Sequence, residues 1–141
     1  MKASTTNYLV DAGPLIGFLD GDDQWHEWSR RALEVLDEPL TTTETVVAEA
    51  CYKLRRLRPA LAVIPRLIAE GRLKLVPVFN EQPQRIGELL AKYPAMDAGD
   101  ATLVVLSELY PRARLITVDD DFRRYRRMRN QAIPLIMPER G

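Results

Sequence analysis

The sequence has few of the residues that build disulfides, zinc sites and membrane spans. Among 141 residues there is one cysteine, Cys51, and one histidine, His26. A single cysteine excludes an internal disulfide, and a single histidine excludes a zinc site built on several histidines. No apolar run approaches the roughly 18 residues of a membrane span, and the amino-terminal apolar stretch is too short for a signal peptide. We therefore expect a cytoplasmic protein that does not enter a membrane.

The sequence also lacks net charge. Its 20 Lys and Arg residues balance 20 Asp and Glu residues, which argues against a generally basic nucleic-acid-binding protein. The charges are nevertheless segregated along the chain. The net charge is −7 over residues 1–50, +6 over 51–92, −4 over 93–122 and +5 over 123–141. Segregation of this kind can place an acidic pocket beside a basic surface.

Short apolar runs alternate with longer stretches of helical spacing, which predicts an α/β protein. The expected strands cover residues 8–10, 40–42, 73–78, 115–118 and 135–137. The hydrophobic content of 46% is sufficient for a core, and the length suits one domain. We expect the whole chain, 1–141, to form one three-layer α/β/α sandwich with a mainly parallel central sheet. A proline inside a helix is unfavourable, so Pro65 is expected to kink or split the helix that Pro59 begins.

Two aspartates directly follow predicted strands. Asp11 comes after strand 8–10, and Asp119 comes after strand 115–118. Because ligands bind beyond the carboxyl ends of parallel strands, we expect these two carboxylates to converge in one crevice. For each aspartate alone, a turn or a helix cap is the simpler alternative.

Three further acids lie where a carboxylate is awkward. Asp97 and Asp100 precede the apolar run 101–109, a predicted buried helix for which Asp97 is a suitable N-cap. Glu49 borders the apolar stripe of the helix that Thr43 is predicted to cap, although a paired or snorkelling edge residue is the simpler alternative. Carboxylates gathered from several segments repel one another unless a cation neutralises them. Oxygen ligands favour Mg²⁺ or Mn²⁺, which support displacement at phosphorus.

Four stretches of the chain resemble the PIN-domain ribonuclease family, and within it the VapC-type toxins of toxin–antitoxin pairs. They are residues 9–15, 42–49, 96–101 and 116–122. The resemblance covers essentially the whole chain and implies a Mg²⁺- or Mn²⁺-dependent endoribonuclease. The acids that it implies for catalysis and metal binding are Asp11, Glu49, Asp100 and Asp119. It further implies an RNA substrate, an antitoxin protein as partner and a homodimer.

The same resemblance implies secondary roles for three residues near these acids. Asp97 and Asp121 match auxiliary acids, and Thr117 matches a residue that holds a metal-bound water, with an ordinary strand threonine as the alternative. Asp120 leaves open which acid of 119–121 faces the site, and Asp119 is favoured because it directly ends the predicted strand. His26 is predicted to be structural.

Two arginine clusters follow the acids, at residues 55, 56 and 58 and at residues 123, 124, 126, 127 and 129. Each is expected either to bind an RNA backbone or to be a solvated face or an anchor for an acidic protein segment. Two other functions are weighed against a nuclease. One is a PIN-fold binding module without catalytic activity. The other is a receiver-like phosphoacceptor domain, which is disfavoured because no lysine lies in or just after the last two predicted strands, 115–118 and 135–137.

Overall fold

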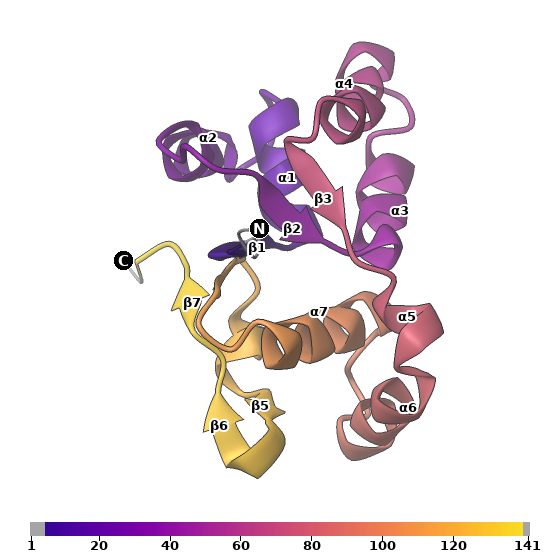
Figure 1. The fold of residues 1–141 in the computed structure, drawn as a ribbon. Helices are drawn as coiled ribbons and strands as arrows, with labels where there is room; N and C mark the ends of the chain where they lie inside the picture. The colour runs from indigo at the N-terminus through magenta and orange to yellow at the C-terminus, as the bar shows by residue number, and fades with distance from the viewer. Residues whose placement is uncertain (1–4, 140–141) are drawn as a thin grey trace.

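A parallel sheet of five strands lies at the centre of the computed structural model, which describes residues 5–139 (Figure 1). The strands are β1 (Tyr8–Val10), β2 (Leu40–Thr42), β3 (Leu73–Leu75), β4 (Arg114–Ile116) and β7 (Leu135–Ile136). Their order is β3-β2-β1-β4-β7, and all neighbours pair in parallel. The chain therefore moves outward from β1 to β3 and returns to the other side of β1 for β4. At such a reversal the strand ends leave a crevice between them.

Helices flank this sheet. Those that connect β1 to β3 are α1 (Ala12–Leu19), α2 (His26–Glu34), α3 (Glu44–Lys53) and α4 (Arg58–Ala69). Those that connect β3 to β4 are α5 (Val78–Glu81), α6 (Pro83–Lys92) and α7 (Ala98–Leu109). The first group occupies the upper half of Figure 1 and the second group the lower half. The predicted α/β sandwich around a mainly parallel sheet is confirmed.

A small hairpin that the sequence analysis did not predict follows β4. After the 3₁₀ turn η1 (Asp120–Arg123), the strands β5 (Arg126–Arg127) and β6 (Gln131–Ala132) pair antiparallel across the 3₁₀ turn η2 (Met128–Asn130).

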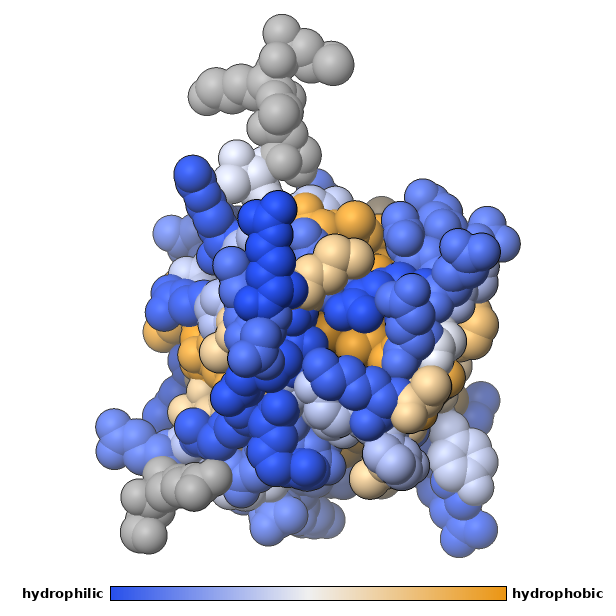
Figure 2. All heavy atoms as spheres, turned by 90° about the horizontal axis from the view of Figure 1, so that it is seen from below, coloured by the Kyte–Doolittle hydropathy of each residue, from blue (hydrophilic) through white to orange (hydrophobic). Residues whose placement is uncertain are grey.

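Seen from below, the surface of the molecule is mostly hydrophilic, with a small hydrophobic area near its centre (Figure 2). No helix among residues 5–139 is both long enough and apolar enough to cross a membrane.

Local capping explains where the helices of the site begin. The side chain of Thr43 accepts a hydrogen bond from Val46 N at 3.3 Å and caps α3 as predicted. Of the two effects predicted for Pro65, a split of its helix is wrong, because α4 continues through it, and a kink stays a prediction. Pro65 is exposed and the preceding Ile64 is buried. The packing of this apolar face therefore outweighs the hydrogen bond that proline removes.

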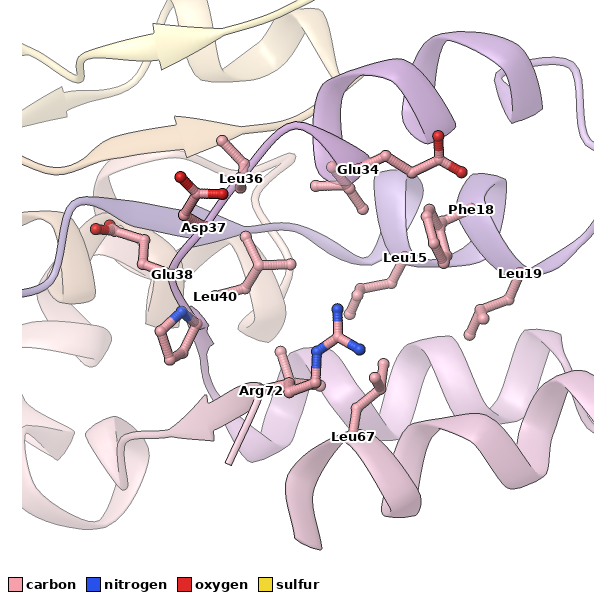
Figure 3. Close-up of a pocket in the computed structure, with 13 residues that line it drawn as sticks. Leu15, Phe18, Leu19, Glu34, Leu36, Asp37, Glu38, Leu40, Leu67 and Arg72 are labelled. Carbon is pink, nitrogen blue, oxygen red and sulfur yellow. The ribbon is translucent and has the colours of Figure 1, made fainter. Parts of the chain in front are cut away.

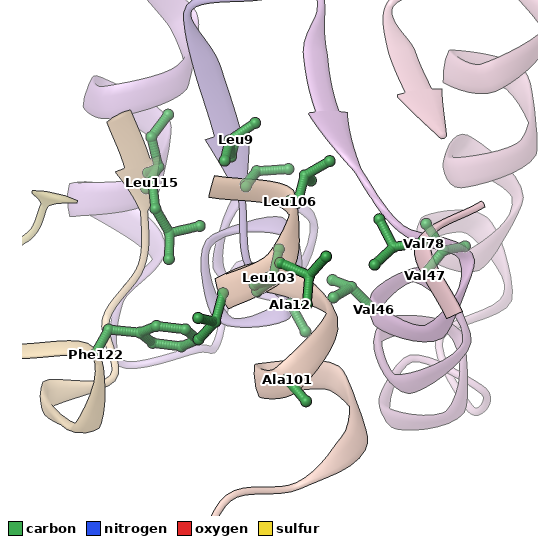
Figure 4. Close-up of a cluster of buried hydrophobic side chains, with 14 of the residues drawn as sticks. Leu9, Ala12, Val46, Val47, Val78, Ala101, Leu103, Leu106, Leu115 and Phe122 are labelled. Atoms are coloured by element: carbon green, nitrogen blue, oxygen red, sulfur yellow. The ribbon is translucent and has the colours of Figure 1, made fainter. Parts of the chain in front are cut away.

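The core lies between α7 and the sheet. Residues 101–107 of α7 are all buried, as the apolar run predicted. Leu103 and Leu106 lie near Leu9 of β1 and Leu115 of β4, and Phe122 packs beside them (Figure 4). Because α7 is buried from its first turn, its amino terminus is fixed at the border of the core.

Candidate active site

The ends of β1 and β4 bring two predicted acids together. Asp11 N donates to Ile116 O at 3.0 Å, which ties the two strand ends. The buried hydroxyl of Thr117 donates to Asp11 Oδ2 at 2.7 Å and accepts from Asp119 N at 3.0 Å. Thr117 therefore holds both aspartates in place.

Strand β4 is shorter than predicted at its carboxyl end. It stops at Ile116, because Thr117 turns its hydroxyl toward Asp11 and the chain bends into η1. Asp119 consequently does not end a strand directly. It caps η1, since its Oδ1 accepts from Asp121 N at 2.9 Å. The other carboxylate oxygen takes no part in this cap.

Helices α3 and α7 contribute the remaining acids. Asp97 Oδ1 accepts from Asp100 N at 2.8 Å and caps α7 as predicted. A Cβ placed on Gly99 would lie 3.4 Å from both Asp97 Oδ1 and Glu49 Oε1. The carboxylate of Glu49, carried by α3, therefore reaches the first turn of α7.

Two buried threonines hold these helices together. Thr43, which caps α3, and Thr102 of α7 share a hydrogen bond of 2.9 Å between their hydroxyls. Thr102 also donates to Gly99 O at 2.7 Å. This buried hydrogen bond thus fixes the position of α3, which carries Glu49, relative to α7, which carries Asp100.

The electrostatics show that the four predicted acids and Asp97 influence one another. Burial, helped by the charges of Glu49 and Asp119, raises the pKa of Asp11 to about 6 against the lowering effect of its hydrogen bonds with Thr117 and Ala12 N. Burial, followed by the charge of Asp97, raises the pKa of Asp100 to about 8. The same two causes raise the pKa of Glu49. Proximity without a neutralising cation therefore favours protonation at this site.

Asp120 and Asp121 lie differently from Asp119. Asp120 pairs with Arg123 at 3.1 Å, and Asp121 pairs with Arg124. Of the three consecutive acids, Asp119 is the one whose charge acts on Asp11, Glu49 and Asp100. The ambiguity among residues 119–121 is therefore resolved in favour of Asp119 as the neighbour of the other acids.

The single histidine lies apart from the acids. His26 Nδ1 donates to Gly17 O at 2.8 Å and so links the start of α2 to α1. Gly17 permits this close approach, because a Cβ there would lie 2.4 Å from Ser29 Oγ. This contact fits the structural role that was predicted for His26.

The donor atoms of the cluster suit a hard cation. Within the described residues, no three Asp, Glu, His or Cys side chains are close enough together to hold a metal ion as they stand. All the side-chain donors are nevertheless oxygens, the type that Mg²⁺ and Mn²⁺ prefer. The raised pKa values of Asp11 and Asp100 indicate that protons compensate the repulsion here. A cation that replaces those protons would draw the carboxylates together.

Tyr125 belongs to the site, although it was not among the residues predicted for it. Its hydroxyl donates to Asp100 Oδ2 at 2.9 Å. Its ring is buried and makes edge contacts with Tyr93 and Phe122, at centroid distances of 5.1 and 5.3 Å. Tyr125 follows η1, a turn that has no periodic signal, so nothing in the sequence pairs it with Asp100.

A cavity of about 380 Å³ lies away from these acids (Figure 3). Leu15, Leu19 and Leu67 line it from α1 and α4, and Arg72 reaches between them. None of the candidate acids is among its lining residues. The carboxylate cluster therefore lies outside this cavity.

A protein family and several solved structures are similar to this chain. The family model of the PIN domain matches residues 8–128. No curated protein sequence matches the chain. Among solved structures, the toxin VapC20 of Mycobacterium tuberculosis, described as cleaving the sarcin-ricin loop, is 15% identical with a TM-score of 0.74. The match covers 82% of this chain and 92% of that one.

Two further structures are similar. A toxin–antitoxin complex from Klebsiella pneumoniae is 18% identical with a TM-score of 0.61, over 81% of this chain and 88% of that one. VapBC2 of Rickettsia felis, bound to a DNA fragment from its promoter, is 16% identical with a TM-score of 0.61. That match covers 94% of this chain and 98% of the other. At these identities the likeness is one of fold.

Proposed function

Because residues 8–128 match its family model, the chain belongs to the PIN domain family, and we propose that it is a metal-dependent endoribonuclease. The observation that carries the proposal is the gathering of carboxylates from four segments at the strand-order reversal. The charge of Asp119 acts on Asp11, Glu49 and Asp100, and the pKa values of these three acids are raised there. The hydroxyl of Thr117 bonds to both Asp11 and Asp119 N. Such clusters of perturbed acids are typical of catalytic sites.

We propose Asp11, Glu49, Asp100 and Asp119 as the metal-binding and catalytic acids, with Asp97 and Asp121 as auxiliary acids. When bound, Mg²⁺ or Mn²⁺ supplies a Lewis acid that lowers the pKa of water and neutralises charge developing at phosphorus. Of the two auxiliary acids, Asp97 is better supported, because its charge acts on Glu49 and Asp100. Asp121 is engaged by Arg124.

The protein's own contribution is to hold these carboxylates in fixed directions. Asp11 accepts hydrogen bonds from Ala12 N at 2.8 Å and from Thr117 Oγ1 at 2.7 Å. Both contacts favour the ionised form of Asp11 against the burial that disfavours it. The hydroxyl of Thr117 is shared between Asp11 and Asp119 N. We therefore assign Thr117 first to orienting these acids, and only secondarily to holding a water.

Partners follow from the same proposal. RNA is the proposed substrate, since VapC20 is described as a toxin that cleaves the sarcin-ricin loop. An antitoxin protein is the proposed partner, because two of the similar structures are described as toxin–antitoxin or VapBC assemblies. A homodimer, which the family resemblance implies, stays a prediction that sedimentation of the purified chain tests.

A PIN-fold binding module without catalysis is the second candidate, because the carboxylates do not form a ready-made metal site. One experiment separates the two functions. The purified chain is incubated with total RNA in Mg²⁺, in Mn²⁺ and in EDTA, and Mn²⁺ binding is measured by calorimetry. Asp11→Asn is compared with Asp22→Asn, an exposed aspartate in the loop after α1.

We expect cleavage in Mg²⁺ or Mn²⁺ that is lost in EDTA and in Asp11→Asn, but kept in Asp22→Asn. Cleavage that resists EDTA would refute the metal dependence. Failure of the wild-type chain to bind Mn²⁺ or to cut RNA would favour the binding module.

A further inference from the structure

The two arginine clusters, which look alike in the sequence, are used differently in the fold. In the cluster after Asp119, Arg123 and Arg124 form ion pairs with Asp120 and Asp121. Arg127 is buried and donates to Ser107 O at 2.8 Å. These three arginines bind groups of the chain itself, as does Arg126, which donates to Arg123 O and Tyr125 O. Arg129, in the turn η2, is exposed and forms no ion pair among the described residues.

The cluster between α3 and α4 is free of such pairs. Lys53, Arg55, Arg56 and Arg58 are all exposed. None of them forms an ion pair with a carboxylate among residues 5–139, since the ion pairs of that part of the chain involve other arginines. Residues 50–69 contain no Asp or Glu. Lys53 lies four residues after Glu49 on α3, whereas Arg55, Arg56 and Arg58 face solvent without a counter-charge nearby in the sequence.

An exposed aromatic ring lies within this cluster. Tyr52 has an exposed fraction of 63%. The guanidinium of Arg55 stacks over the ring at 4.0 Å from its centroid. Arg55 is held there because its Nη1 donates to Tyr52 O at 2.8 Å, while Arg58 Nη1 donates to Arg55 O at 3.1 Å. The stack is thus arranged before any ligand binds.

We call Tyr52, Lys53, Arg55, Arg56 and Arg58 the basic corner. It adjoins the acid site, because Tyr52 follows Glu49 by three residues on α3 and so lies about one turn along the same helix. The two residues are about 4.5 Å apart along the helix axis. Side chains at this spacing lie on the same face of a helix, so Tyr52 is the neighbour of Glu49 on α3. The charge of Lys53 also acts directly on Glu49.

We propose that the basic corner binds single-stranded RNA beside the proposed catalytic acids. A base stacks on the open side of the Tyr52 ring, and Lys53, Arg56 and Arg58 contact phosphates. Single-strand binding combines these two elements, an aromatic platform and a positive surface along the backbone. A single strand fits better than a duplex, because the bases of a duplex are not free to stack on a side chain. The inference rests on the proposed nuclease function and names the part of the substrate that this corner holds.

The test measures binding of a fluorescent single-stranded RNA of 12 nucleotides to the full chain in EDTA, where cleavage is not expected. Tyr52→Ala removes the ring, Tyr52→Phe keeps it, and Arg56→Ala removes one charge. The matched controls are Phe79→Ala, which removes another exposed aromatic side chain, and Arg112→Ala, which removes an exposed arginine before β4. Sedimentation of every variant reports its mass, and cleavage in Mg²⁺ reports its activity.

We expect Tyr52→Ala to weaken binding about tenfold or more, while Tyr52→Phe and the two controls bind like wild type. Arg56→Ala should lower the slope of log K against log salt by about 0.7, the value for one phosphate contact in a single strand. Equal affinity of Tyr52→Ala and wild type, with normal cleavage, would overturn this inference and leave the nuclease proposal intact. A change in mass in place of a change in affinity would also overturn it, because the corner would then be an interface between copies. A wild-type chain that neither binds nor cuts RNA would overturn both proposals.

Discussion

Replacing Asp11 by Asn should stabilise the metal-free protein although it removes a proposed catalytic acid. The carboxylate of Asp11 lies at the end of β1, among the negative charges of Glu49 and Asp119. Its pKa rises from 3.8 to about 6, so the folded state binds a proton more tightly than the unfolded chain does. Ionisation of Asp11 at neutral pH therefore costs folding free energy that a neutral amide avoids.

The magnitude follows from the size of that shift. About two pKa units at 1.36 kcal/mol each give roughly 3 kcal/mol at pH values above the folded pKa. This figure is an upper bound, because the side chain is only half-buried and solvent screens part of the repulsion. The amide also accepts weaker hydrogen bonds from Ala12 N and Thr117 than the carboxylate does. We expect a net gain of about 1–2 kcal/mol at pH 7.5, and a rise in Tm of several degrees.

The assay is urea unfolding in EDTA at pH 7.5 and pH 4, with Asp22→Asn as the control. At pH 4 the folded carboxyl of Asp11 is largely protonated, so the gain from Asp11→Asn should almost vanish. Excess Mg²⁺ should stabilise the wild type, because a ligand of the folded state shifts the unfolding equilibrium, and should stabilise Asp11→Asn less. A variant less stable than wild type at pH 7.5, or equally stabilised at both pH values, would refute the reasoning.

Three other expectations follow from the same cluster. The pKa of Asp100 is raised to about 8, so its proton is bound more tightly in the folded than in the unfolded protein. The stability that this proton contributes is complete below pH 4 and is lost as the pH rises to 8. Urea midpoints of the metal-free protein should therefore fall over that window. Gly99→Ala should lower Mn²⁺ affinity in calorimetry several-fold, because the added Cβ would lie 3.4 Å from Glu49 Oε1 and Asp97 Oδ1. Little stability should be lost, because alanine favours a helix. Unchanged affinity would contradict this. Tyr125→Phe removes the hydrogen bond to Asp100 and should cost about 1–2 kcal/mol at pH 8 in the same urea assay, but less at pH 5, where Asp100 is protonated; an equal loss at both would indicate a packing effect alone.

The fold could be predicted because its signals are local. The parallel strands are short apolar runs, and Thr43 and Asp97 cap their helices where the sequence indicated. The β5–β6 hairpin lacks such signals. Its turn places Arg129 and Asn130 at positive φ, 62° and 57°, and hairpin turns of this kind usually have asparagine or glycine at both positions. Arg129 occupies the first of these positions within an arginine-rich segment, so the sequence did not indicate a turn there.

Pro65 illustrates a different limit of prediction. Its effect depends on the balance between one lost hydrogen bond and the packing of the whole apolar face of α4. The local rule gives the cost of the lost hydrogen bond. The packing of α4 depends instead on tertiary contacts such as those of the buried Ile64. The sequence rule therefore identified the unfavourable position correctly and misjudged its consequence.

The acids of the site that follow strands or begin helices could be predicted from the sequence. Asp11 and Asp119 were recognised because parallel strands end at one edge of a sheet. Tyr125 was not, because its link to Asp100 depends on how η1 folds back on α7. The arginine clusters did carry a local signal, since Arg123 and Arg124 each follow an acid by three residues, the spacing at which they pair in the structure.

The arrangement also explains how a neutral chain can present both an acidic site and a basic surface. Acids at the sheet edge are drawn close by the ends of β1 and β4 and by the buried start of α7, so their repulsion is imposed by the core. Three of the arginines after Asp119, namely Arg123, Arg124 and Arg127, are engaged in ion pairs and in a buried contact with α7. Arg55, Arg56 and Arg58, between Lys53 and the first turn of α4, make no ion pairs among the described residues. Opposite charges that balance in the sequence are therefore separated in the fold: α3 carries Glu49 toward the acids, and exposed arginines follow its carboxyl end.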